Sequence, residues 1–172
     1  SAEAMAELGT IYYIKYEEKR QATLASKKMW NVNKDDKENL KKSFNYFKQS
    51  ANLENRDAQY KYGIMHQEGL GTEKNLSKAL WWFRKAGEGN QGQKRAQSKC
   101  GKMYYHGEGT APNFSKALRW YKKAADQGDS DAQFKCGLMH YNGEGTAKNV
   151  SEALRYYELA ANQNNGKAQF NL

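Results

Sequence analysis

Residues 58–63 read Ala-Gln-Tyr-Lys-Tyr-Gly, and the motif returns at 96–101 as Ala-Gln-Ser-Lys-Cys-Gly and at 132–137 as Ala-Gln-Phe-Lys-Cys-Gly. The intervals between successive copies are 38 and 36 residues. Self-similarity at a fixed period of this length is the signature of an array of repeated structural units. The chain is therefore predicted to be a repeat protein.

Two further motifs keep the same phase. Each copy is followed by Gly-x-Gly-Thr, at 69–72, 107–110 and 143–146, and then by Ser-Lys-Ala-Leu or Ser-Glu-Ala-Leu, at 77–80, 115–118 and 151–154. The two additional residues of the first interval fall in the glycine-rich segment 87–92, where extra loop length costs little free energy. Three full repeats are thus defined by sequence alone.

Each repeat is predicted to be a helix, a tight turn and a second helix. Small and large apolar residues recur at helical spacing in both halves, as in Ala58, Tyr62, Met65 and His66 and then Ala79, Trp82, Phe83 and Ala86. Gly63 is expected where two backbones approach closely, and the Gly-x-Gly glycines tolerate the positive φ that ends a helix. An asparagine four residues before each Ala79-type position is expected to cap the second helix; these are Asn39, Asn75, Asn113 and Asn149.

The repeats divide the chain, which we predict to be a single repeat domain over residues 1–172. A degenerate repeat at 1–55 carries an insertion at about 14–33, and full repeats follow at 56–92, 93–130 and 131–166. The insertion is polar and tolerant of helix, so it is expected to lengthen a helix or form a loop. A further repeat starts at 167–172, so the array is expected to continue beyond this sequence.

Composition agrees with a helical protein. Apolar residues make up 38% of the chain, with one proline and few β-branched residues, which favours packed helices over sheets. We find neither an apolar run long enough to span a membrane nor the order of a signal peptide, and the localisation stays undetermined. The net charge of +9 points to an acidic partner or to nucleic acid.

The combined pattern resembles the Sel-one-like repeat, a relative of the tetratricopeptide repeat. It reads Ala-x-x-x-[Leu/Tyr/Cys]-Gly-x-x-[Tyr/His]-x-x-Gly-x-Gly, then Lys-Ala-x-x-[Trp/Tyr]-[Tyr/Phe]-x-Lys-Ala-Ala, and covers nearly the whole chain. The resemblance implies an all-α, right-handed solenoid, a superhelix of antiparallel helix-turn-helix repeats. Members of this family are adaptors, so it also implies binding to another protein rather than catalysis.

The residues that could bind a metal, form a disulfide or bind phosphate are better explained as structural residues of the repeat. Cys136 and His140, with Cys100 and His66, are ligand types that suit zinc, yet they occupy the buried positions of the repeat. Cys100 and Cys136 are equivalent residues of adjacent repeats, about 8–10 Å apart by helix packing, which is too far for a disulfide. The Gly-x-Gly turns follow helices rather than strands, which argues against phosphate binding. We therefore expect no catalytic residue, metal or cofactor.

The binding surface is predicted by analogy with tetratricopeptide proteins, where the first helix of each repeat lines the concave side. Aromatic and aliphatic residues on the face not needed for packing are expected to anchor a protein or peptide partner. Arg95 and Lys102 add a basic centre suited to an acidic segment. The groove residues are Tyr60, Ile64, Gln67, Arg95, Lys102, Tyr105, Phe134, Leu138 and Tyr141; Asp57, Ser98 and Asp131 share this face, and Tyr13 and Phe170 would extend it.

Two rival functions are open at this point. Much of the positive charge falls on the second helices, at Arg84, Lys85, Arg119, Lys122, Lys123 and Arg155, where it could bind nucleic acid or an anionic surface. The aromatic residues that such binding needs lie on the other helices, so a solvated outer face is the favoured interpretation. A hydrolase of the type once suspected for cysteine-rich relatives is the second rival. A monomer is favoured over an oligomer.

Overall fold

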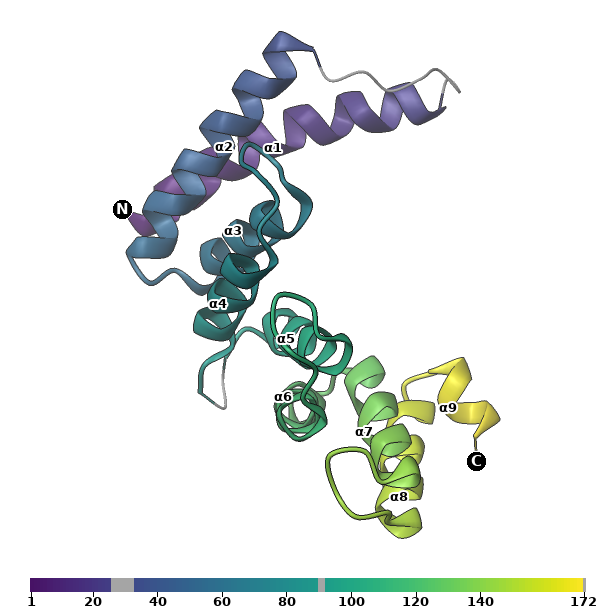
Figure 1. Ribbon diagram of the computed structural model, residues 1–172. Coiled ribbons are helices and arrows are strands. Elements are labelled where there is room, and N and C mark those ends of the chain that lie inside the picture. Colours follow the sequence, from purple (N-terminus) through teal and green to yellow (C-terminus); the bar gives the residue numbers. More distant parts are fainter. Residues whose placement is uncertain (26–32, 90–91, 172) are drawn as a thin grey trace. The chain divides into compact units, whose positions relative to one another are not determined.

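The structure is a computed structural model that describes residues 1–25, 33–89 and 92–171. In this part of the chain every regular element is an α-helix, as Figure 1 shows. The helices are α1 (Ala2–Ala25), α2 (Lys34–Asn52), α3 (Arg56–Glu68), α4 (Leu76–Gly87), α5 (Lys94–His106), α6 (Phe114–Asp126), α7 (Ser130–Asn142), α8 (Val150–Ala161) and α9 (Gly166–Phe170). The predicted all-α fold of helix-turn-helix repeats is confirmed.

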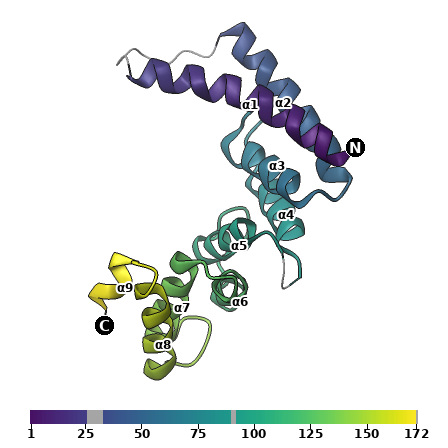
Figure 2. The same ribbon diagram turned by 180° about the vertical axis from the view of Figure 1, so that it is seen from behind.

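The helices form two compact units, Ser1–Trp82 and Phe83–Leu172, with the division inside α4. In the first unit α2 packs against both α1 and α3. In the second unit α6 packs against α5 and α7, and α8 against α7 and α9. Both views show α1 beside α2 and α7 beside α8 (Figures 1 and 2). The helices in these contacts therefore pack on their neighbours in sequence, as in a repeat array.

Glycines end the first helix of each full repeat, as predicted. Gly69, Gly107 and Gly143 follow α3, α5 and α7 with φ of 73°, 74° and 75°, in the left-handed region. Each glycine N–H donates to the carbonyl four residues earlier, that of Met65, Met103 or Met139. The helix end is thus closed by a backbone geometry that favours glycine.

Asparagine caps begin the second helices in three of the four predicted places. The side chains of Asn75, Asn113 and Asn149 accept hydrogen bonds from the backbone N–H groups of residues 78, 116 and 152 at 2.8–3.0 Å. The expected cap at Asn39 is wrong, because Asn39 lies inside α2. α2 begins six residues earlier, where Asn33 and Asp36 form a reciprocal capping box that satisfies the first backbone donors.

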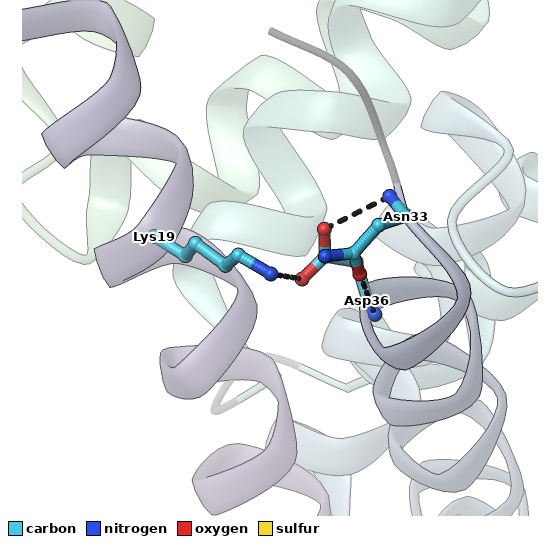
Figure 3. A network of polar contacts seen from close by, with 3 residues as sticks. All are labelled: Lys19, Asn33 and Asp36. Carbon is cyan, nitrogen blue, oxygen red and sulfur yellow. Dashed lines mark hydrogen bonds and ion pairs between the residues drawn. The ribbon is translucent and has the colours of Figure 1, made fainter. Parts of the chain in front are cut away.

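The insertion at 14–33 is partly described. α1 continues through its first part to Ala25, so these residues lengthen a helix, whereas residues 26–32 lie outside the described residues. Lys19 in the lengthened part of α1 donates to Asp36 Oδ1 at 2.9 Å, as Figure 3 shows. The same carboxylate accepts from the Asn33 N–H at 3.1 Å through Oδ2. The extension of α1 is therefore tied to the start of α2.

The core consists of the residues that recur in phase. Ala58, Tyr62, Met65 and His66 are buried, and so are the alanines of the second helices, with Ala79, Ala117 and Ala153 fully buried. The close approach predicted at Gly63 takes another form at its equivalents Gly101 and Gly137. A Cβ on either would lie 2.6 Å from the ring of Tyr121 or Tyr157, so glycine mainly admits an aromatic ring; at Gly137 the Ala153 carbonyl oxygen is also close, at 3.1 Å.

Among the helices described, none combines the length and apolar character needed to cross a membrane.

Candidate functional site

The predicted groove residues lie on the first helix of each repeat and all of them remain at least partly exposed. In the first unit, Tyr60, Ile64 and Gln67 are half-buried along α3. Their neighbours Ala58, Gln59, Tyr62, Met65 and His66 are buried on the packing face of the same helix. The helical period thus separates a packing face from an accessible face.

The second unit shows the same separation on α5 and α7. Arg95 and Lys102 are exposed, Tyr105, Phe134 and Leu138 are half-buried, and Tyr141 retains 48% of its surface. The buried residues of these helices are alanine, cysteine, methionine and glycine, together with Gln97, Tyr104, Gln133 and His140. Apolar side chains on the accessible face are therefore in excess of what the core uses.

Two separate hollows receive part of the predicted set. Lys102 and Phe134 line a hollow of about 360 Å³, which we call the basic hollow. Leu138 and Tyr141 line another of about 240 Å³, the apolar hollow, with Val150, Leu154 and Tyr157 of α8. Arg95 and Tyr105 line neither. Sequence reasoning missed the contribution of α8 to this hollow. The signal was available, because Val150 and Leu154 are apolar residues four positions apart on α8 that the core does not bury.

Tyr105 has a partner within its own unit. Its hydroxyl donates to Glu144 Oε2 at 3.0 Å, and its ring meets the Phe114 ring edge-on at 5.1 Å. Partial burial, followed by the hydrogen bond and charge of Glu144, raises the pKa of this phenol. Tyr105 therefore links α5 to the turn after α7, and only the rest of its surface is available to a partner.

The cysteines and buried histidines behave as core residues. Cys100 and Cys136 are free thiols without exposed surface, and burial raises the pKa of Cys136 to about 12 and that of Cys100 further. His140 stacks on Tyr156 at 5.7 Å, His66 meets Tyr62 edge-on at 4.7 Å, and burial lowers the pKa of both imidazoles. Across the described residues we find no group of three metal ligands. These side chains therefore pack in the core of the repeats.

The basic side chains of the second helices are exposed as predicted, except for that of Lys123. Arg84, Arg119, Lys122 and Arg155 are exposed as expected, but Lys123, which we expected in solvent, is half-buried. Its Nζ lies 4.9 Å from the centre of the Trp120 ring, so a cation–π contact holds it against the helix. Arg155 is likewise engaged, with Glu152 at 2.9 Å and over the Tyr156 ring at 4.4 Å.

A family model described as the Sel1 repeat matches five segments of the chain. They are residues 2–17, 34–55, 56–91, 94–129 and 130–165. The match to the first repeat is interrupted between 17 and 34, where the insertion lies. No curated protein sequence matches the chain significantly.

Solved structures of repeat proteins resemble the chain over almost its full length. A Sel1 repeat protein from Oxalobacter formigenes is 28% identical with a TM-score of 0.78, over 98% of this chain and 61% of that one. The protein c5321, a protective antigen of uropathogenic Escherichia coli strains with an SLR fold, is 26% identical with a TM-score of 0.80, over 98% of this chain and 32% of that one. This chain thus spans less than two thirds of either relative.

A third structure, the cysteine-rich protein B of Helicobacter pylori, shares the fold alone. It is 24% identical with a TM-score of 0.61, over 79% of this chain and 96% of that one. This likeness gives no support to the hydrolase that was the second rival.

Proposed function

The chain belongs to the Sel1 repeat family, and from that premise we propose that it is a non-enzymatic scaffold that binds a partner protein or peptide along the accessible face of its first helices. Sel1 repeat proteins are generally protein-interaction scaffolds. The finer part of the proposal is the location: the face of α3, α5 and α7 that the core leaves uncovered.

The observation that carries this proposal is the apolar surface left exposed on α7 and α8. Tyr141, Val150 and Leu154 retain 48%, 47% and 41% of their surface, and Leu138 beside them is half-buried. Large apolar side chains grouped around a hollow are typical of protein interfaces. Aromatic side chains also lose little conformational entropy on binding, which suits them as anchors.

The shape of the surface favours a peptide or protein over a small substrate. Hollows of about 240 and 360 Å³ each take one or two side chains, and repeat surfaces contact a segment along several successive repeats. A helical or extended peptide is the partner that such a surface accommodates best.

The test is to identify a partner by crosslinking in the source cells and to measure its affinity for matched variants. Replacing Tyr105 and Tyr141 together by alanine is expected to weaken binding by about 2 kcal/mol or more with helical content unchanged. Because Tyr105 also bonds Glu144, Tyr141→Ala alone is included, and it should account for most of the loss. The control is the pair Lys122→Ala and Lys123→Ala on α6.

The same measurement separates the proposal from the electrostatic rival. If the α6 variant loses the partner while the tyrosine variants retain it, binding occurs through the basic second helices and the groove proposal is wrong. A nucleic-acid partner would in addition show an affinity that falls steeply with salt.

A further inference from the structure

The basic hollow brings together three lysines from separate helices of the second unit. Lys102 comes from α5, Lys135 from α7 and Lys167 from α9. Residues 83–172 carry 14 Lys and Arg against 8 Asp and Glu, so the excess of positive charge extends over the whole unit. Of these three lysines, sequence reasoning placed only Lys102 on the accessible face; Lys135 and Lys167 lie 33 and 65 residues further along the chain.

The carboxylates near the hollow are already engaged by other groups. Asp131, the only carboxylate that lines it, accepts from Asn165 Nδ2 at 3.0 Å. Nearby Asp129 uses one oxygen to cap α7 through the Ala132 N–H at 2.9 Å and the other to accept from Ser98 Oγ at 3.0 Å. No ion pair within the described residues involves any of the three lysine ammonium groups. The three lysines outnumber the one carboxylate that lines the hollow, so a surplus of positive charge is available to an anion from outside.

The rest of the wall combines the polar residues Ser98 and His106 with an apolar part. Phe134, Tyr121 and Ala132 line it, and Phe134 is held by its contact with the Tyr157 ring at 5.8 Å. A volume of about 360 Å³ is near the lower end of ligand sites, which run from about 300 to 1,000 Å³. The hollow therefore fits one or two side chains that combine a negative charge with an apolar part.

We propose that the basic hollow binds a carboxylate of the partner, an acidic residue flanked by an apolar one, with Lys102, Lys135 and Lys167 as donors and Phe134 as the apolar contact. This inference rests on the proposed function and specifies the chemistry of the partner at that surface. A carboxylate can accept from two ammonium groups at once, and such charge-assisted bonds are stronger than neutral ones. Lysine stems can also lie along the apolar part of the ligand while the ammonium groups reach the charge.

The test uses two synthetic peptides that differ only in charge, acetyl-Gly-Glu-Phe-Glu-Gly-amide and acetyl-Gly-Gln-Phe-Gln-Gly-amide, with the whole chain labelled for NMR. The acidic peptide is expected to shift the amide resonances of residues 102, 135 and 167, and the neutral peptide to leave them in place. Replacing Lys102 and Lys135 together by Gln is expected to lower the affinity for the acidic peptide about tenfold or more. A tenfold loss corresponds to about 1.4 kcal/mol. Affinity should also fall as salt rises.

The matched control removes the same charge elsewhere in the unit, through Arg119→Gln with Lys122→Gln on α6. This variant should retain affinity for the acidic peptide. Equal losses in both variants would show a diffuse field in place of a site, and absent or equal binding of the two peptides would overturn the proposal. Binding of a short oligothymidylate at these residues without binding of the acidic peptide would assign the hollow to phosphate and also overturn it.

The same variants distinguish failure here from failure of the proposed function. If Tyr141→Ala abolishes partner binding and the Lys102 and Lys135 variant retains it, the proposed function is supported and the carboxylate site is wrong. If neither variant weakens partner binding, the proposed binding surface itself is wrong.

Discussion

The first helix pair, α1 and α2, and the pair α7 and α8 use the same packing positions with different connections. A Cβ on Gly9 would lie 2.9 Å from the Phe47 ring, and one on Gly137 would lie 2.6 Å from the Tyr157 ring. Three residues after each glycine, Tyr12 stacks on Tyr46 at 5.8 Å and His140 on Tyr156 at 5.7 Å. The contact between the two helices is therefore nearly the same in both pairs.

The connections differ throughout. α7 and α8 have 13 and 12 residues, and a left-handed glycine and an asparagine cap join them. α1 and α2 have 24 and 19 residues, and a capping box with the Lys19–Asp36 ion pair marks the start of α2. A small number of in-phase positions is thus sufficient to specify how two helices pair, while the link between them is free to vary.

The largest effect is expected from overfilling the shared small position of the second helix. Ala117 in α6 and Ser43 in α2 are both fully buried at this position, so Ala117→Leu and Ser43→Leu should each lower the free energy of unfolding by about 1–3 kcal/mol. The measurement is the urea midpoint of each variant. The exposed Lys122→Ala is the control, with an expected change below about 0.5 kcal/mol.

Two outcomes would break the comparison at this point. Equal midpoints for Ala117→Leu and Lys122→Ala would show that the helix faces are wrongly assigned. A tolerated Ser43→Leu beside a damaging Ala117→Leu would show that the first pair packs by a different rule.

The next effect is confined to the first pair. Asp36 has 2% of its surface exposed and accepts from both Lys19 and the Asn33 N–H, so Asp36→Ala should cost about 1–2 kcal/mol. Lys42→Ala, which removes an exposed ion pair with Glu38, should change the denaturation midpoint much less, because solvent screens that pair. Chemical denaturation followed by circular dichroism checks both, and similar losses would show that the capping box does not hold this pair.

A smaller effect is expected at the glycine that admits the aromatic ring. Gly101→Ala forces the Tyr121 ring to move, and the cost of overpacking is partly offset by better helix propensity, leaving a net loss of about 1 kcal/mol. Gly166→Ala, with no atom within 4 Å of its Cβ, should be neutral or slightly stabilising. Gly9→Ala should fall between them, because its contact with Phe47 is less close; thermal unfolding ranks the three variants.

The smallest effect is a dependence of stability on pH that comes from two buried histidines, a residue type that α1 and α2 do not contain. In the folded chain, burial lowers the pKa of His66 and His140 below the usual value of 6.5. As the pH falls, the unfolded chain therefore takes up protons on these histidines first. Stability is then complete above about pH 6.5 and declines below it until the folded imidazoles also protonate. The double variant with His66→Phe and His140→Phe should lose less stability than the native chain between neutral pH and about pH 5.

Urea midpoints measured at several pH values give these slopes directly. Identical slopes for the native chain and the double histidine variant would show that burial of the two rings does not contribute to acid sensitivity.

Sequence by itself determined the repeat, its phase and most helix boundaries in the full repeats. Gly69, Gly107 and Gly143 end helices, and Asn75, Asn113 and Asn149 begin them, because backbone conformation and capping depend on a few neighbouring residues. Helical periodicity likewise separated buried from accessible faces. The cap placed at Asn39 was wrong because it assumed that the degenerate repeat follows the same local rule as the others.

Only the tertiary structure decided which distant residues meet. It bonds Tyr105 to Glu144 across 39 residues, divides four of the predicted groove residues between two hollows, and adds Lys135 and Lys167 to Lys102. The repeat pattern does not predict these contacts, because it describes the packing within each copy, whereas the Tyr105–Glu144 bond and the three lysines join residues of different copies. The fold follows from local interactions that recur in each repeat, namely helix caps, glycine helix ends and helical periodicity. The candidate site depends instead on which side chains the packing of successive helices brings together.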